Sequence, residues 1–150
     1  MTPVELLTSL SGPAALSGAP FGADLIAFCT ALRARGGVGL YVARDDKTAA
    51  TARRMAQFVA PRLEQVDLPS WDTLPYDRVS PTAGVAARRC AALARLSRYE
   101  PAQGPILIVT TASSLVQRVP PVSVLRRSSF AVTLGQSVNQ KELTEYLAVN

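Results

Sequence analysis

The sequence predicts an α/β fold: a three-layer, doubly wound domain in which helices cover both faces of a parallel sheet. Two continuous apolar runs, residues 38–43 (VGLYVA) and residues 105–109 (PILIV), are typical of strands buried on both faces. The segments around these runs repeat apolar residues at helical spacing, and strands that alternate with helices form parallel sheets with right-handed crossovers. With 150 residues and 48% hydrophobic side chains, the chain has enough apolar material to fill a core.

The N-terminal part is predicted to hold a strand, a turn and a helix. Residues 13–17 form a short, weakly apolar run that ends at Gly18. Residues 35–37 (RGG) are predicted to end the helix that follows, because glycine disfavours helical structure. The apolar face of that helix has the i, i+3, i+4, i+7 spacing and consists of Leu25, Phe28, Cys29 and Leu32.

A second strand–helix unit is predicted to begin at residue 38. After the strand of residues 38–43, Asp45 or Asp46 is positioned to cap a helix that ends before Pro61. Residues 65–68 are predicted to form a short third strand. The apolar stripe of the helix consists of Ala52, Met55, Ala56 and Val59.

The turn-rich stretch of residues 69–81 precedes a long predicted helix. Ser80 is expected to cap this helix and Pro81 to occupy its first position, with its end near Ser97. Its predicted core face consists of Ala86, Cys90, Leu93 and Leu96.

The run at residues 105–109 is the strongest strand signal in the chain. Thr110 and Thr111 follow it and lead into a short predicted helix that carries Leu115 and Val116. This unit completes the predicted α/β domain, which we place at residues 1–122.

The alternation of strands and helices stops after residues 119–121 (VPP), where we expect a domain boundary between residues 121 and 127. Residues 129–134 are predicted to form a strand and Gly135 a turn. Asn139 and Glu142 have the spacing of a capping box for a last helix, Lys141 to about Ala148. Residues 123–150 are therefore expected to begin a second, α+β subdomain.

The composition excludes several classes of protein. Histidine is absent, which rules out a Ser-His-Asp triad and any imidazole-ligated metal on this chain. The two cysteines, Cys29 and Cys90, lie among apolar residues and are predicted to be buried thiols. No run approaches the roughly 18 to 20 apolar residues of a membrane span, and no secretory signal is visible. We expect a cytoplasmic protein without a membrane partner.

The net charge of +5 comes almost entirely from arginine, with 14 Arg and 2 Lys against 11 acidic residues. These arginines are scattered along alanine-rich helices, and aromatic residues do not alternate with them as in a stacking platform for bases. Solvated helix faces therefore account for the charge better than a nucleic-acid groove, which stays open as an alternative.

Residues 18–24 (GAPFGAD) have the position and the glycine spacing of a phosphate-binding loop but not its chemistry. A working loop needs inward backbone N–H groups, a lysine for the phosphates and a Ser or Thr for Mg²⁺. Here Pro20 removes a donor, no lysine follows Gly22, and Asp24 adds a negative charge. The loop, which begins at Gly18, is either an ordinary glycine-containing turn before a helix or a relic of a nucleotide site.

Two stretches are distinctive: residues 68–81 (LPSWDTLPYDRVSP), followed by residues 85–89 (VAARR), and residues 108–121 (IVTTASSLVQRVPP). Together they resemble the N-terminal module of the transcription-repair coupling factor family. The tail of residues 130–147 is similar to the start of the second subdomain of that module, so we expect the chain to end inside it. The motif residues are Trp71, Asp72, Leu74, Pro75, Tyr76, Asp77, Gln117, Arg118, Pro120 and Pro121.

The motif residues also have ordinary structural interpretations. Trp71 and Tyr76 form a contact surface or cover the edge of the core. Asp72 and Asp77 are better explained as turn caps than as catalytic carboxylates, because no histidine, lysine or metal ligand lies near them in the sequence. Arg118 either pins the domain junction or is a solvated charge.

The resemblance implies a module similar to domain 1a of UvrB that is not itself catalytic. In this family the module recruits UvrA, through the second subdomain that is largely missing here, and restrains an ATP- and Mg-dependent motor elsewhere in the protein. RNA polymerase and DNA are contacted through other domains. No catalytic, cofactor or metal residues are expected in this segment. A UvrB-like helicase domain and a DNA-binding α/β domain remain alternatives, although the altered loop and the short span between Tyr76 and Pro81 depart from UvrB.

Overall fold

A computed structural model of the chain describes residues 3–9, 11–15, 17–74 and 78–149. Its centre is a three-stranded parallel sheet in the order β1-β3-β2. The strands are β1 (Val38–Ala43), β2 (Glu64–Leu68) and β3 (Ile106–Thr111). Val38 and Glu64 both lie opposite Ile106, so the three strands begin level with one another. The predicted α/β class and the three parallel strands are confirmed.

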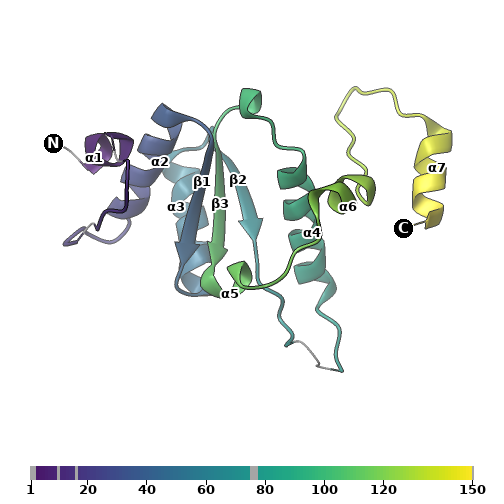
Figure 1. Cartoon of the computed structure of the whole chain (residues 1–150), viewed down its shortest axis with the longest axis horizontal. Coiled ribbons are helices and arrows are strands. Elements are labelled where there is room, and N and C mark those ends of the chain that lie inside the picture. Colours follow the sequence, from purple (N-terminus) through teal and green to yellow (C-terminus); the bar gives the residue numbers. More distant parts are fainter. Residues whose placement is uncertain (1–2, 10, 16, 75–77, 150) are drawn as a thin grey trace.

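Helices cover the sheet on both sides (Figure 1). On one face lie α2 (Ala23–Arg35) and α3 (Asp46–Val59), and on the other lies α4 (Ala83–Ser97). The core under α2 and α3 includes Leu25, Cys29, Leu32, Ala52, Ala56, Leu107 and Val109, and the core under α4 includes Val66, Leu68, Ala92 and Ile106. The two cores make the predicted three-layer arrangement.

The ends of α2 and α3 follow from local chemistry. Gly36 ends α2 with a φ of 74°, a conformation that side chains with a Cβ rarely adopt. Asp45 caps α3, because its carboxylate accepts a hydrogen bond from the Thr48 N–H at 2.8 Å. This bond is the first cause that holds the pKa of Asp45 down, at about 2. Both boundaries agree with the prediction.

Helix α4 begins at Ala83, so the prediction of Ser80 as cap and Pro81 as first residue is wrong. Thr82 precedes the helix, and its hydroxyl donates to the Asp72 carboxylate at 2.6 Å instead of capping the helix. Thr82 is therefore held by the loop that contains Asp72, so α4 begins after Thr82 rather than at Pro81.

The predicted core face of α4 is also partly wrong. Cys90 is exposed, whereas Arg89 is only 1% exposed. Leu93 and Leu96 do pack against the core. Arg89, rather than Cys90, lies on the face that carries Ala92, because residues three apart share a helix face.

Strand β1 is buried on one face only, contrary to the prediction. Val38, Leu40 and Val42 are about half exposed. They lie on the face of the sheet that α4 packs against, but α4 covers β2 and β3 and does not reach the edge strand β1. The predicted strand before Gly18 is absent, since residues 13–15 and 17 have no regular structure. That run is rich in alanine and begins with Pro13, and neither residue favours a strand.

Further helices flank the domain: α1 (Pro3–Ser9) packs on α2, and a 3₁₀ turn (Pro101–Gln103) precedes β3. Helix α5 (Ala112–Leu115) follows β3 directly, as predicted. In the described part of the chain, no helix is long and apolar enough to cross a membrane.

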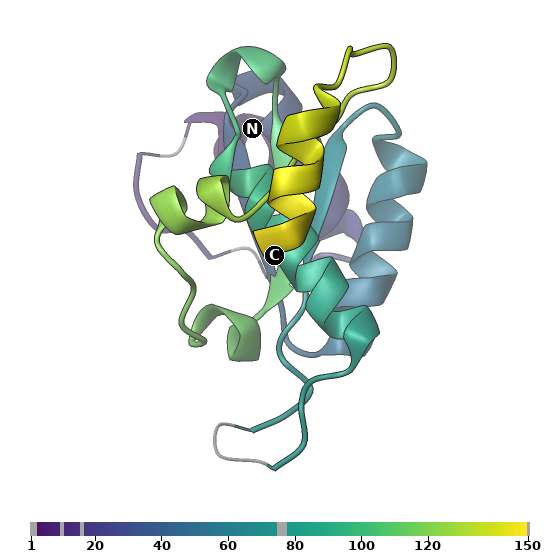
Figure 2. The same cartoon turned by 90° about the vertical axis from the view of Figure 1, so that its right-hand side faces the viewer.

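After α5 come two helices, α6 (Val122–Arg127) and α7 (Gln140–Val149), and Figure 2 views the molecule from their side. The predicted last helix is confirmed, and Asn139 caps it by accepting from the Lys141 N–H at 3.0 Å. The predicted strand at residues 129–134 is wrong. A strand needs a neighbour, and Phe130 instead contacts the Tyr146 ring, with centroids 5.5 Å apart.

Two arginines hold α6 against the end of α4. The Arg98 guanidinium donates to the carbonyl oxygens of Arg126 and Ser129. In return, Nε of Arg126 donates to the Ser97 carbonyl at 2.6 Å. Each arginine thus satisfies carbonyl groups at the end of the other's helix, which lack partners within the helix.

Candidate functional site

Two hollows lie at the carboxyl edge of the sheet, where parallel α/β sheets bind ligands. We call them the loop cavity, lined by residues 18–22, Asp24, Tyr41 and Met55 among others, and the motif pocket, lined by residues 70–74, Pro81, Ser113 and residues 116–118. Each contains residues that the sequence singled out.

The loop cavity measures about 390 Å³ and lies between the loop at residues 18–22 and helix α3. Gly18 and Gly22 have φ values of 72° and 81°, so both glycines are in the left-handed region. The Ala23 N–H donates to the Pro20 carbonyl at 3.0 Å. This backbone donor is therefore engaged within the loop rather than directed at a ligand.

Side chains occupy the part of the loop cavity in which a phosphate would approach the glycines. The end of the Met55 side chain lies against Gly22 so closely that a Cβ on that glycine would collide with it. The Asp24 carboxylate accepts a hydrogen bond from the Tyr41 hydroxyl at 3.1 Å. Burial raises the pKa of Tyr41, and this hydrogen bond raises it further. The residues present do not fit a nucleotide phosphate, because they offer a thioether and a carboxylate where a lysine is needed.

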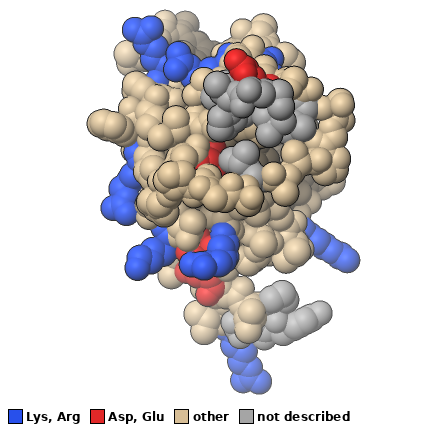
Figure 3. Space-filling view, turned by 90° about the vertical axis from the view of Figure 1, so that its left-hand side faces the viewer, with Lys and Arg blue, Asp and Glu red and all other residues tan. Residues whose placement is uncertain are grey.

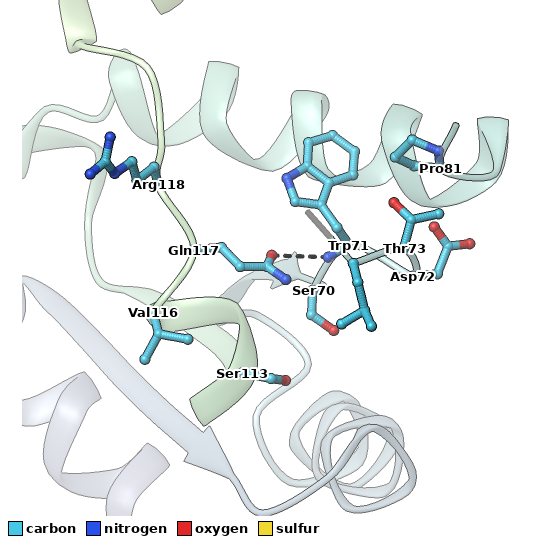
Figure 4. A pocket seen from close by; sticks show the side chains of 10 residues that line it. Ser70, Trp71, Asp72, Thr73, Pro81, Ser113, Val116, Gln117 and Arg118 are labelled. Carbon is cyan, nitrogen blue, oxygen red and sulfur yellow. Dashed lines mark hydrogen bonds between the residues drawn. The ribbon is translucent and has the colours of Figure 1, made fainter. Parts of the chain in front are cut away.

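The motif pocket is larger, about 1040 Å³, and brings two distant stretches of sequence together (Figure 4). One wall comes from the segment after β2, with Trp71, Asp72 and Leu74, and the other from the segment after α5, with Gln117 and Arg118. Five of the described motif residues, Trp71, Asp72, Leu74, Gln117 and Arg118, thus line one pocket although the two stretches are far apart in the chain.

A hydrogen bond between Trp71 and Gln117 joins the two walls. The Trp71 backbone N–H donates to Oε1 of Gln117 at 3.0 Å, across 46 positions of sequence. Because a backbone N–H can only donate, the bond assigns the amide orientation of Gln117. Nε2 of Gln117 makes no hydrogen bond to another described residue, so it can donate to a ligand.

Arg89 lies beneath Trp71 and was not predicted as a site residue. Its guanidinium is 5.3 Å from the Trp71 ring centroid, and its Nη1 donates to the Pro69 carbonyl at 2.6 Å and to Ser114 Oγ at 2.8 Å. Nη2 is buried without a hydrogen-bond partner among the described residues. Burial lowers the pKa of Arg89. A signal was present in the sequence, since Arg89, Ala92, Leu93 and Leu96 have the i, i+3, i+4, i+7 spacing of a core face.

Of the two aspartates of the motif, the structure describes Asp72. The Asp72 carboxylate accepts hydrogen bonds from the backbone N–H and from the hydroxyl of Thr82. The bond from the hydroxyl is the first cause that lowers the pKa of Asp72. This role as a turn anchor is the predicted one. Asp77 lies outside the described residues, as do Pro75 and Tyr76.

The second motif block ends at the entrance of α6. Arg118 is exposed, and no hydrogen bond or ion pair joins it to another described residue, whereas Arg98 and Arg126 pin the junction. Pro121 immediately precedes α6, and Pro120 is exposed before it. Within the described ranges, no cluster of acidic or cysteine side chains could hold a metal ion.

The arginines do not build a continuous basic surface on the face shown in Figure 3, where Lys and Arg lie mainly around the edges. Several arginines are engaged internally. Arg53 forms an ion pair with Asp67, and Arg95 forms one with Glu64 at 2.6 Å. These arginines are paired within the domain, whereas the sequence predicted solvated arginines on the helix faces.

Curated proteins named transcription-repair-coupling factor are similar to this chain, which confirms the resemblance. One from Rickettsia bellii (strain RML369-C) is 26% identical over 109 residues, 73% of this chain and 10% of that protein. One from Mycobacterium bovis (strain ATCC BAA-935 / AF2122/97) is 46% identical over 57 residues, 36% of this chain and 5% of that protein. The chain therefore covers a tenth or less of the length of these relatives. No protein-family model matches the chain, and no solved structure matches it significantly.

Proposed function

We propose that this chain is a non-catalytic interaction module that acts in transcription-coupled nucleotide-excision repair. The similarity to transcription-repair coupling factors supports a role in this process. The observation that carries the non-catalytic part is the loop cavity, in which Met55 lies against Gly22 and Asp24 binds Tyr41. A loop arranged in this way has no group that would neutralise a triphosphate.

The module is proposed to act by restraining the motor of a full-length coupling factor and by taking part in the recruitment of UvrA. Two features support an interaction role. Trp71, Asp72, Leu74, Gln117 and Arg118 line an exposed pocket rather than filling the core, and the described part of that pocket contains no nucleophile–base pair. UvrA contact itself is assigned to the second subdomain, of which residues 123–150 are the proposed beginning.

The restraint is tested on a relative from which the segment similar to this chain has been deleted. We expect the deletion to raise its rate of ATP hydrolysis, and the added chain to lower that rate again in a concentration-dependent manner. The matched control is the Val109→Asp variant, which places a carboxylate at a fully buried position and is expected not to fold. Equal rates with and without the folded chain would contradict the restraint.

A pull-down separates the two parts of the proposal. The chain alone is expected not to retain UvrA, because the contact is assigned to a second subdomain to which only residues 123–150 are proposed to belong, whereas a segment of a relative that includes that subdomain retains it. Retention of UvrA by the 150-residue chain would place the contact on the α/β domain instead. Hydrolysis of ATP by the isolated chain would favour the alternative of a UvrB-like enzyme domain.

A DNA-binding function is the remaining alternative. Because Arg53, Arg89, Arg95, Arg98 and Arg126 are engaged within the domain, we expect only weak binding that disappears as salt rises. Fluorescence anisotropy at about 150 mM salt should show essentially no binding to a duplex or to a single strand. Sub-micromolar affinity under these conditions would favour the DNA-binding alternative.

A further inference from the structure

We infer that the motif pocket docks an extended protein segment that carries both an apolar side chain and a carboxylate. This inference rests on the proposed role as an interaction module and names the chemistry of the partner. It is drawn from the size of the pocket, its exposed apolar side chains and the imbalance of its charges.

The size of the pocket favours a polypeptide over a small metabolite. Its volume of about 1040 Å³ is at the upper end of the roughly 300 to 1,000 Å³ typical of small-molecule sites. Pro81 and Arg118 lie at opposite ends of the pocket in Figure 4, and the Arg118 guanidinium points away from Trp71. A ligand that contacts both Trp71 and Arg118 is therefore extended.

Apolar side chains are unusually exposed here. Leu74 is 74% exposed and Val116 is 84% exposed, although both line the pocket. Trp71 is partly buried between the pocket and Arg89, so the arginine fixes the position of its ring. Exposed apolar groups around a rigid aromatic residue are characteristic of surfaces that bind other proteins.

The charges around the pocket are unbalanced in favour of a negatively charged ligand. The one described carboxylate in the lining, Asp72, keeps its charge when it accepts hydrogen bonds from the neutral Thr82, so the excess positive charge comes from Arg118 together with the buried Arg89. Arg118 makes no hydrogen bond or ion pair with another described residue, and Arg89 has none with a described carboxylate. A carboxylate of the partner would accept hydrogen bonds from Arg118, and Nε2 of Gln117 would donate to a second acceptor further along the extended segment.

The contacts of Gln117 explain how the pocket is held ready for this ligand. Its Oε1 is fixed by the Trp71 N–H, so its Nε2 keeps one direction before any ligand arrives. Arg89 binds the end of β2 through Pro69 and binds α5 through Ser114, which fixes both walls. We assign Arg89 as a positioning residue and Arg118 as the residue that contacts the ligand.

The test is a selection from a library of random 12-residue peptides displayed on phage, with the folded chain as bait. We expect the enriched peptides to combine Asp or Glu with Leu, Phe or Trp. The most enriched peptide is then synthesised with a fluorescent label, and its affinity for variants of the chain is measured by anisotropy. Arg118→Glu is expected to weaken binding at least about tenfold, because it places a like charge opposite the carboxylate.

Arg62→Glu is the matched control, since Arg62 is also exposed but lies before β2, at the opposite edge of the sheet. It should change the affinity less than about twofold, as expected for a charge remote from the site. A second variant, Val116→Glu, should also abolish binding without affecting the fold, because Val116 is exposed. Circular dichroism of each variant verifies folding.

The inference is overturned if no peptide is enriched, if the enriched peptides lack acidic residues, or if Arg118→Glu and Arg62→Glu have equal effects. Displacement of the labelled peptide by a DNA duplex at equal concentration would also overturn it, because the site would then recognise phosphates. If the Val116→Glu variant still lowered the rate of ATP hydrolysis by the motor, the docking site would be rejected and the proposed function would stand. If the wild-type chain did not lower that rate, the proposed function itself would be rejected.

Discussion

The backbone N–H of Trp71 and Oε1 of Gln117, 3.0 Å apart, connect the segment after β2 to the segment after α5. Neither segment has regular structure at this point, so side chains rather than sheet hydrogen bonds must fix their separation. Arg89 assists from below through Pro69 and Ser114. The walls of the motif pocket therefore depend on the side chains of Arg89, Ser114 and Gln117. Each of these side chains can be removed by a separate substitution.

Gln117→Ala is expected to lower the free energy of unfolding by about 1 to 2 kcal/mol, because it leaves the partly buried Trp71 N–H without its acceptor. Urea unfolding monitored by the fluorescence of Trp71, the one tryptophan, measures this loss. Gln57→Ala serves as control, since Gln57 is exposed on α3, and should change stability by less than about 0.5 kcal/mol. Equal effects of the two substitutions would show that the bond to Trp71 does not hold the walls together.

Arg89→Ala is expected to cost about 2 to 4 kcal/mol, because it opens a cavity under Trp71 and removes a donor from Pro69 and Ser114. Arg89→Met should recover most of this loss, since it keeps the volume of the side chain and removes a buried charge that has no described carboxylate partner. Thermal or denaturant unfolding compares the two. Arg88→Ala, which removes only a half-exposed arginine 3.6 Å from Asp67, is the control and should cost less than about 1 kcal/mol.

The loop cavity is expected not to bind ATP. Titration calorimetry with ATP and Mg²⁺ should give no dissociation constant below about 100 μM, which corresponds to roughly −5.5 kcal/mol. The double substitution Ala23→Lys and Asp24→Ser should not restore binding, because the Met55 side chain still lies against Gly22. A triple variant that adds Met55→Ala tests whether the Met55 side chain is what blocks ATP binding. Tight binding by the unaltered chain would refute the reading of the loop as a degenerate site.

Much of the α/β domain was predictable from the sequence because its signals are local. The apolar runs at residues 38–43 and 105–109 correspond to β1 and to most of β3, and Asp45, one of the two predicted caps, caps α3. Five of the motif residues line one pocket, and their meeting there depends on how β2 and β3 lie in the sheet, which no local pattern encodes.

Two of the failures, those at Arg89 and Thr82, have a common physical origin, since each concerns a residue whose partners lie elsewhere in the chain. Arg89 is buried in α4 only because Pro69, Trp71 and Ser114 surround its guanidinium. Thr82 moves the start of α4 because Asp72 holds it. The sequence predicted a solvated arginine at position 89 and a helix cap at Ser80. Contacts with distant residues instead bury Arg89 and place the start of α4 after Thr82.

The stability of the chain should depend on pH through Asp45. Its folded-state pKa is lowered to about 2 from an ordinary value of 3.8, so the folded state favours the charged carboxylate. The stabilisation is present above the unfolded-state pKa and is lost as the pH falls from about 4 to about 2. Asp45→Asn, which keeps a capping oxygen but cannot titrate, should flatten the pH dependence in this window. Unfolding titrations at several pH values measure the difference, and an unchanged slope would contradict it.

The C-terminal tail is expected to be less stable than the α/β domain, although α6 is bound to α4. Hydrogen exchange should be slowest in β1 and β3, near the global unfolding limit, and much faster at residues 129–134 and in α7, which bury no residue fully. Arg126→Ala removes the donor to the Ser97 carbonyl, so it should accelerate exchange in α6 and α7 while leaving β3 unchanged.

Arg127→Ala is the matched control for the tail, because Arg127 occupies the next position of α6 and is exposed without a bond to another described residue. It should leave exchange in α6 and α7 close to that of the unaltered chain. If residues 129–149 were instead as protected as β3, the tail would belong to the first domain and the boundary expected between residues 121 and 127 would be misplaced. If Arg126→Ala accelerated exchange in β3 as well, the reciprocal contacts of Arg98 and Arg126 would be part of the α/β core rather than a junction between two units.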